Sequence, residues 1–354
     1  MIPGSSPRPD AEMRIAVDAM GGDTGPQEVV RGVVQAASRS TQAHFLLVGD
    51  PVVLEAELAR ARPRPANIEV IPASQVIEMT DQPTTAVRRK PDASVLVGAR
   101  MVKEGKADGL VTIGNTGAAM AVSLLTWGRI KGIDRPAIAT PLPSLAGTVV
   151  LLDAGATPDC DPNNLYEFAV MGSVYSEQIV GVPKPRVGLL SNGEEASKGN
   201  ELVKRTHALF KQAMEDKAPF SFVGNVEGKD IFRGTVDVVV CDGFTGNIVL
   251  KTGEGVAEMV LHLIKEELGR HAWMKPLLLP LMPALRRLRG KVDYAERGGA
   301  PLLGVNGVCI IGHGRSNALA VRNACHAAER AIRHDIIETI RQRVCVAPTP
   351  PPPL

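Results

Sequence analysis

Short apolar runs, small polar residues and helical patterns follow one another repeatedly along this chain. The apolar runs are continuous in Val, Ile and Leu, as in strands that are buried on both faces of a parallel sheet. The runs with the polar residues after them are RIAVDAMGGDTG, HFLLVGD, ADGLVTIGNTG, GTVVLLDAGAT, RVGLLSNGEEASKGN, VDVVVCDGFTGN and GVCIIGHGRSN. After the first run, Pro26 suits the first turn of a helix. The pattern predicts an α/β fold with a mostly parallel sheet flanked by helices.

Four of the polar loops contain the sequences GNTG, SNGEEASKGN, GFTGN and GHGRSN. We expect them at the carboxyl ends of strands, where ligands bind in open parallel sheets. Each loop also precedes a helix, whose free backbone N–H groups and dipole favour an anion. Any one loop is also explained by turn chemistry and helix capping. The four loops together favour a site that binds phosphate.

Residues 256–298 depart from this pattern, because they show helical periodicity and no strand. Between residues 274 and 291 there are five basic residues and no acid. Apolar side chains flanked by cations fit a segment that lies in the interface of an anionic membrane. A core helical hairpin or a dimer contact stays open as an alternative. The candidates for membrane contact are Trp273, Leu277, Leu278, Leu281, Arg286, Arg287, Arg289 and Lys291.

The composition of the 354-residue chain narrows the classes of function. Its net charge of +2 and its 3% of aromatic residues argue against nucleic-acid binding. The dinucleotide fingerprint GxGxxG and the metalloprotease motif HExxH are absent, so we expect no cofactor and no bound metal. Asp18 and Asp23 in DAMGGD are candidate metal ligands, but we favour turn and capping roles for them.

The five cysteines form no CxxC pair, which fits a reducing, cytoplasmic compartment. Cys241 and Cys309 lie within apolar runs, and we expect both to be buried. Residues 1–12 are expected to form a disordered lead, and the proline-rich residues 346–354 a loose tail. The predicted domain therefore spans residues 13–345.

With these motifs in view, the chain resembles the bacterial phosphate acyltransferases, which transfer a fatty acyl group from acyl carrier protein to inorganic phosphate. The resemblance covers about residues 14–333 and is carried by IAVDAMGGD, GNTGA, LLDAGA, LLSNGEEASKGN, FVGNVEGKDI, VVCDGFTGNIVLKTGEG, PLLGVNG and GHGRSNALA. The number, order and spacing of these motifs make the match specific. Two places depart from the family pattern. Thr112 and Ile113 replace a common Ser-Ala pair, and Ser94 stands alone where the family often has two serines.

The resemblance implies a three-layer α/β/α sandwich related to the phosphotransacetylase and isocitrate dehydrogenase-like folds. In that fold, residues 256–298 would be a helical hairpin excursion used for dimer and membrane contact. The resemblance also implies a cytoplasmic homodimer that associates peripherally with the inner face of the membrane. The implied partners are acyl carrier protein, inorganic phosphate, the anionic membrane surface and a membrane glycerol-3-phosphate acyltransferase that receives the acyl phosphate.

The implied reaction needs no protein nucleophile, because a phosphate oxygen can attack the activated thioester directly. The protein must hold phosphate against the carbonyl group and stabilise the tetrahedral oxyanion. We expect Lys198 to neutralise charge, Asn192 to donate a hydrogen bond, and His313 to orient phosphate or protonate the departing thiolate. A purely structural role for His313 stays open, as does a helix-capping role for Asn200.

The other candidates for phosphate or substrate binding lie in the polar loops. They are Asp18, Gly21, Gly22, Asp23, Asn115, Thr116, Gly117, Gly193, Ser197, Asn200, Thr245, Gly246, Asn247, Gly314, Arg315 and Ser316. Two other functions stay open. The chain could be a short-chain phosphotransacetylase that uses acyl-coenzyme A, or a non-catalytic relative that binds acyl carrier protein or membrane.

Overall fold

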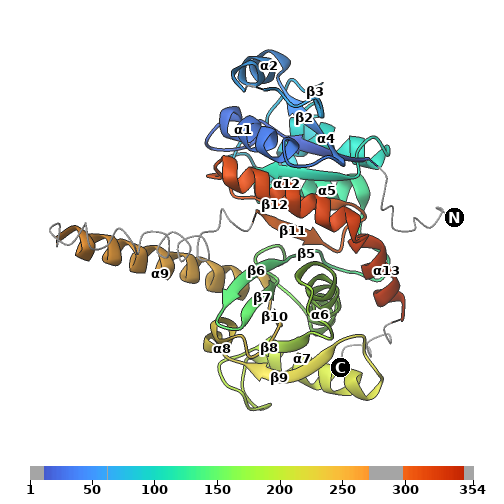
Figure 1. The fold of residues 1–354 in the computed structure, drawn as a ribbon. Coiled ribbons are helices and arrows are strands. Elements are labelled where there is room, and N and C mark those ends of the chain that lie inside the picture. The colour runs from blue at the N-terminus through green and yellow to red at the C-terminus, as the bar shows by residue number, and fades with distance from the viewer. Residues whose placement is uncertain (1–11, 62, 271–297, 347–354) are drawn as a thin grey trace.

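The structure, a computed structural model, describes residues 12–61, 63–270 and 298–346. Its strands form two sheets that lie one above the other in Figure 1. The predicted disordered lead and proline-rich tail fall almost wholly outside the described residues. The α/β class and the mostly parallel pairing of strands are confirmed.

The first sheet has seven strands in the order β3-β2-β1-β4-β12-β11-β5. The first five of these strands run parallel to one another, whereas β11 is antiparallel to both β12 and β5. Every residue of β4 and β12 is buried, which accounts for their continuous apolar sequences. The bounds are β1 (Met13–Asp18), β2 (Ala43–Gly49), β3 (Ile68–Pro72), β4 (Gly109–Ile113), β5 (Ala137–Ile138), β11 (Ala300–Leu303) and β12 (Val308–Gly312).

The second sheet has five strands in the order β6-β7-β10-β8-β9, and only β6 is antiparallel to its neighbour. Its strands are β6 (Thr140–Ser144), β7 (Gly147–Leu152), β8 (Arg186–Leu190), β9 (Ser221–Val226) and β10 (Val238–Val240). The division into two sheets was not evident from the apolar pattern. Its physical origin is the segment of residues 136–144, whose three prolines cannot donate hydrogen bonds and therefore favour edge strands. This segment forms β5 at the edge of the first sheet and β6 at the edge of the second.

Helices cover both sheets, and several of them begin with proline, whose fixed φ angle and missing N–H suit a first turn. The prediction for Pro26 is confirmed, because α1 starts there. Cys241 and Cys309 are both buried, also as predicted. The helices are α1 (Pro26–Ala37), α2 (Pro51–Arg60), α3 (Pro83–Arg89), α4 (Ser94–Lys103), α5 (Thr116–Trp127), α6 (Pro162–Tyr175), the π-helical turn η1 (Ser176–Val180), α7 (Glu201–Glu215), α8 (Gly228–Arg233), α9 (Gly243–Arg270), α12 (Ala318–Arg333) and α13 (Ile336–Val346).

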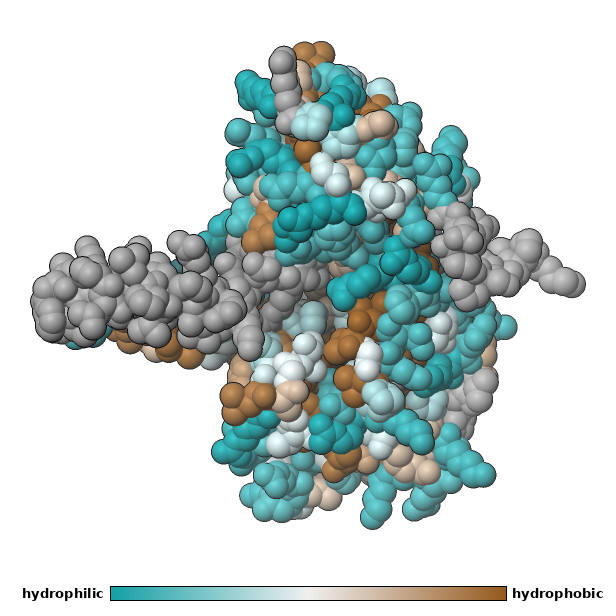
Figure 2. Space-filling view, viewed as in Figure 1, coloured by the Kyte–Doolittle hydropathy of each residue, from teal (hydrophilic) through white to brown (hydrophobic). Residues whose placement is uncertain are grey.

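The long helix α9 projects from the body of the molecule (Figure 1), and hydrophobic residues are visible along its described part (Figure 2). Beyond its first turns, four of its apolar side chains are between 44% and 55% exposed, namely Val256, Met259, Val260 and Leu263. Within the described part of the chain, no helix combines the length and apolar character needed to cross a bilayer. All eight predicted membrane-contact residues, from Trp273 to Lys291, lie outside the described residues.

A single buried carboxylate joins the two sheets. Asp153 follows β7 in the second sheet and is 0% exposed, and its Oδ1 accepts a 2.8 Å hydrogen bond from the N–H of Ile138 in β5 of the first sheet. The backbone N–H groups of residues 155–157 donate to the same carboxylate. In return, the N–H of Ala154 donates to the carbonyl oxygen of Ile138. Burial raises the pKa of Asp153, while the four N–H donors act in the opposite direction.

The start of α9 packs directly against this junction. The N–H of Gly243 donates a 2.9 Å hydrogen bond to the carbonyl oxygen of Thr157. A Cβ atom at Gly246 would lie 1.9 Å from the carbonyl oxygen of Asp153. Only a residue without a side chain therefore allows α9 to begin here. Gly246 is a predicted phosphate-binding residue, and in this structure its close contact is with the Asp153 backbone at the junction.

We predict that Gly246→Ala lowers the free energy of unfolding by roughly 3 kcal/mol or more, because the added methyl group overlaps the Asp153 carbonyl. Gly255→Ala on the same helix is the matched control, because nothing lies within 4 Å of its ideal Cβ position. There, alanine should stabilise the helix by up to about 1 kcal/mol. Urea unfolding of both variants measures the difference. Equal stability of the two variants would contradict the proposed packing at the junction.

Candidate functional site

Asp18 ends β1 and is the buried centre of the first predicted loop. It is 3% exposed, and its Oδ1 and Oδ2 accept hydrogen bonds from the hydroxyl groups of Ser94 at 2.6 Å and Thr112 at 2.8 Å. Burial raises the pKa of Asp18, and these hydroxyl groups oppose that effect. These contacts fit the favoured turn role, since both carboxylate oxygens hold the surrounding elements together.

The two departures from the family pattern therefore meet at one carboxylate. Ser94 begins α4 and Thr112 lies in β4, yet both contact Asp18. Threonine at position 112 retains the hydroxyl that serine would supply, so the contact is kept. Ser94, whose role the sequence left in doubt, acquires a defined structural partner.

Three loops at the carboxyl edge of the first sheet pack backbone against backbone. The N–H of Asp23, after β1, donates a 2.8 Å hydrogen bond to the carbonyl oxygen of Gly314, after β12. A Cβ atom at Gly114, after β4, would lie 2.7 Å from the carbonyl oxygen of Gly21. The structure thus brings the predicted residues of these three loops together.

Asn115 caps α5 and fixes a neighbouring segment. Its Oδ1 accepts a 3.0 Å hydrogen bond from the N–H of Ala118, and its Nδ2 lies 3.3 Å from three carbonyl oxygens within residues 78–81. These contacts occupy the side chain that we predict as a phosphate donor. Thr116 begins α5, and Gly117 lies against the ring of Pro83.

His313 follows β12 and is partly shielded from solvent. Its Nδ1 accepts a 3.3 Å hydrogen bond from the N–H of Arg315, so the neutral ring carries its proton on Nε2. Burial lowers the pKa of His313, and the positive charges of Lys251 and Arg315 lower it further. The carboxylates of Glu254 and Asp23 act in the opposite direction. His313 therefore lies where charges from several elements converge.

The hydroxyl of Ser316 donates a 2.6 Å hydrogen bond to the carbonyl oxygen of His313, and Thr24 donates to the carbonyl oxygen of Ser316. These bonds fix the loop after β12 against the loop after β1. In this structure, the predicted candidate Ser316 therefore holds the backbone of the loop in place.

Lys251 reaches this region from the second sheet, because α9 starts there. Leu250 packs against the apolar core of the first sheet and also against that of the second. Asn247, one turn before Lys251, lies beside Gly155 of the junction loop. The ammonium group of Lys251 pairs with Glu254 at 2.9 Å. The first turns of α9 therefore connect the carboxyl edges of the two sheets.

The loop of residues 191–200 follows β8 and is held in shape by two asparagines. The side-chain oxygen of Asn192 accepts a 2.8 Å hydrogen bond from the N–H of Gly199, which closes the loop on itself. Nδ2 of Asn225, from β9, donates to the carbonyl oxygen of Glu195 at 2.9 Å. Both contacts fix the backbone on either side of the loop's cation.

That cation, Lys198, is exposed, and the described residues form no ion pair with it. Gly193 lies against its aliphatic stem, since a Cβ atom there would be 2.7 Å from the Lys198 Cγ. Ser197 is exposed beside it, and Glu194 pairs instead with Lys229 at 3.6 Å. The ammonium group of Lys198 therefore faces solvent without an ion pair among the described residues.

Two further candidates form hydrogen bonds at helix N-termini. Asn200 accepts a 2.9 Å hydrogen bond from the N–H of Val203 and caps α7, the alternative that the sequence left open beside phosphate binding. The N–H and hydroxyl groups of Thr245 both donate to Asp242 at 2.8 Å. The Asn200 Oδ1 and the two donors of Thr245 are therefore engaged within the protein.

The predicted residues thus form two groups, one at the carboxyl edge of each sheet. A cavity of about 420 Å³ in the second group is lined in part by Asn192, Asn200 and Thr245. Helix α9 links the groups, because it starts beside the second sheet and carries Lys251, whose charge acts on His313.

Sequence reasoning missed three residues of this region. Lys251 lies in the same motif as GFTGN, four residues after Asn247. Residues at this spacing share one face of a helix, so the sequence could have grouped Lys251 with the predicted Asn247. Thr112 and Asn225 could not be assigned in the same way, because their partners Asp18 and Glu195 are distant in sequence.

Residues 13–339 match the family model described as "Fatty acid synthesis protein". A relative named phosphate acyltransferase from Desulforudis audaxviator is 51% identical over 328 residues, covering 93% of this chain and 95% of its own length. Another of that name, from Heliobacterium modesticaldum, is 49% identical over 333 residues, covering 94% of this chain and 98% of its own.

Two solved phosphotransacetylases share the fold. The one from Streptococcus pyogenes has a TM-score of 0.59 at 17% identity and covers 94% of each chain. The EutD phosphotransacetylase from Staphylococcus aureus has a TM-score of 0.57 at 17% identity, covering 94% of this chain and 96% of that one. At this identity the likeness concerns the fold alone. It confirms the predicted likeness of the fold to that of phosphotransacetylases.

The electrostatic environment of His313 gives a direct prediction. Lys251→Gln should raise the pKa of His313, because it removes a positive charge that disfavours the imidazolium. Glu254→Gln should lower that pKa for the opposite reason. NMR titration of the imidazole measures both changes. Lys204→Gln, an exposed change on α7, is the control and should leave the value unaltered. An unchanged titration in the Lys251 variant would remove α9 from the site.

Proposed function

The chain belongs to the phosphate acyltransferase family, and from this premise we propose that it transfers a long-chain fatty acyl group from acyl carrier protein to inorganic phosphate. Its relatives support an acyltransferase of fatty acid and phospholipid synthesis that uses phosphate as the acyl acceptor. Beyond this activity, we propose that acyl carrier protein is the acyl donor and that the acyl chain is long.

One observation carries the assignment of the phosphate site. Arg315 on the first sheet and Lys251 on α9 both lower the pKa of His313 by their positive charge. A place where cations from two elements act on one imidazole favours an anion. We propose that phosphate binds there, between the loop after β12 and the face of α9 that carries Lys251.

In the proposed reaction, a phosphate oxygen attacks the thioester carbonyl carbon and forms the new C–O bond. The tetrahedral intermediate then collapses, the C–S bond breaks, and the thiolate leaves and takes up a proton. Because the thiolate is a good leaving group near neutral pH, strong acid catalysis is not required. The protein contributes mainly by orienting the reactants and stabilising the oxyanion.

The neutral His313 ring suits this role, because its Nε2–H can donate a hydrogen bond to phosphate or to the departing sulfur. Lys198 would supply a third cation from the loop after β8. Its charge is uncompensated among the described residues, so it is available to a bound anion or to the developing oxyanion.

Two alternatives are separated by one assay. A short-chain phosphotransacetylase would form acyl phosphate fastest from acetyl-coenzyme A, and a non-catalytic relative would form none from any donor. The proposed enzyme forms it fastest from a long-chain acyl carrier protein. Measuring acyl phosphate from these donors and from long-chain acyl-coenzyme A decides between the three functions.

We predict that Lys198→Ala lowers turnover by about ten- to a few hundredfold, as expected for loss of a charge-assisted contact of roughly 1.5–3 kcal/mol. The fold should be unaffected, because the side chain is exposed. Lys204→Ala, an exposed lysine on α7, is the matched control and should retain parental kinetics. Parental turnover in the Lys198 variant would exclude this role for its charge.

We also propose that the enzyme is a cytoplasmic homodimer held peripherally at the inner membrane face. The free cysteines fit a reducing compartment. The exposed apolar residues of α9 recur at helical spacing and suit packing against a second copy. The basic, apolar sequence of residues 274–291 supports membrane contact. There, the acyl phosphate would be available to a membrane glycerol-3-phosphate acyltransferase.

Two double variants test these contacts against each other. Val256→Glu with Leu263→Glu should give a monomer in analytical ultracentrifugation, because both residues share the exposed face of α9. Leu278→Glu with Leu281→Glu should remain dimeric but lose flotation with anionic vesicles. A dimeric first variant would exclude the α9 face from the dimer, and a vesicle-bound second variant would exclude that segment from the anchor.

A further inference from the structure

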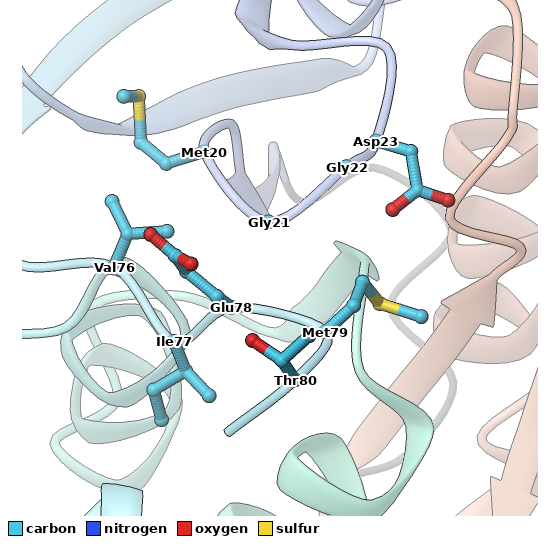
Figure 3. A pocket seen from close by; sticks show the side chains of 9 residues that line it. All are labelled: Met20, Gly21, Gly22, Asp23, Val76, Ile77, Glu78, Met79 and Thr80. Atoms are coloured by element: carbon cyan, nitrogen blue, oxygen red, sulfur yellow. The ribbon is translucent and has the colours of Figure 1, made fainter.

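A separate cavity of about 430 Å³ lies beside the carboxyl edge of the first sheet. In Figure 3, the backbone of Gly21 and Gly22 faces the segment that carries Val76 to Thr80. Met20 lies at one side of this space and Met79 towards the other. Its volume is within the range of small-molecule sites.

The far wall of this cavity is built by long-range contacts. The ammonium group of Lys90 donates to the carbonyl oxygen of Val76 at 2.8 Å and pairs with Asp81 at 2.6 Å. The amide of Asn115 contacts carbonyl oxygens within residues 78–81. The wall is therefore fixed by side chains that follow α3 and β4, namely Lys90 and Asn115.

The chemistry of the lining disfavours an anion. Its charged residues are Asp23 and Glu78, both acidic, and no cation lines it. The apolar lining comes from Met20, Val76, Ile77 and Met79, and the remainder consists of glycine backbone and Thr80. Phosphate would be repelled here, whereas an uncharged chain that combines methylene and amide groups finds a partner for each. Methionine side chains adapt readily to such flexible ligands.

We propose that this cavity holds the uncharged pantetheine arm of the acyl donor, with its thioester towards the loop after β12. The inference rests on the proposed acyl transfer and assigns the donor a place apart from phosphate. The geometry supports the direction, because Asp23 at one end of the cavity bonds through its N–H to Gly314, next to His313. The arm would thus bring the thioester carbonyl towards the cationic region from the side opposite α9.

The test uses Met79, which is 46% exposed and can be changed without disturbing the core. Met79→Trp should fill the cavity and raise the KM for butanoyl- and hexadecanoyl-pantetheine donors by about tenfold each. The KM for phosphate should remain unchanged. Leu145→Trp is the matched control, because Leu145 is 90% exposed beside the second sheet. Circular dichroism and thermal unfolding of each variant establish that the fold is intact.

A second measurement is independent of turnover. Binding of S-butyl-pantetheine, a stable thioether, is followed by calorimetry, and Met79→Trp should weaken it about tenfold relative to the parent and to Leu145→Trp. An unchanged dissociation constant would overturn the proposal. A loss confined to the long-chain donor would also overturn it, since the cavity would then hold the acyl tail. If the parent binds the thioether but forms no acyl phosphate from any donor, the proposed function fails while the site stands.

Discussion

The buried carboxylate of Asp153 is the interaction on which the arrangement of this molecule depends. It accepts hydrogen bonds from four backbone N–H groups, and one of these, that of Ile138, belongs to the other sheet. A buried carboxylate is costly unless it is fully hydrogen-bonded, so this cluster tolerates little rearrangement. Because α9 begins against the same residue through Gly246, the junction also fixes where that helix can point.

This constraint explains how two separate sheet edges can contribute to one reaction. Each edge has its own polar loops, as parallel sheets generally do. The direction of α9 brings Lys251 from the second sheet to the vicinity of His313 on the first. We propose that the charges of the two regions direct phosphate and the acyl donor to different places. The cationic region between the sheets suits phosphate, and the acidic and apolar cavity near Met20 suits an uncharged donor arm.

The sequence predicts those features that depend on local chemistry. Continuous apolar strands, the proline that opens α1 and the capping role of Asn200 all follow from residues close to one another. The partition into two sheets was not predicted, because it depends on how a proline-rich segment finds an edge in each sheet. The site is more difficult to predict from the sequence, because a predicted donor such as Asn115 can form its hydrogen bonds with residues more than thirty positions away. Whether a polar side chain serves a ligand or the fold is decided by such distant partners.

The most direct test of this account is a crystal structure of the protein with bound inorganic phosphate. We expect the phosphate between the loop that carries His313 and Arg315 and the face of α9 that carries Lys251. A phosphate seated instead in the cavity between Met20 and Met79, or bound with no contact to α9, would contradict the proposed division of the two substrates.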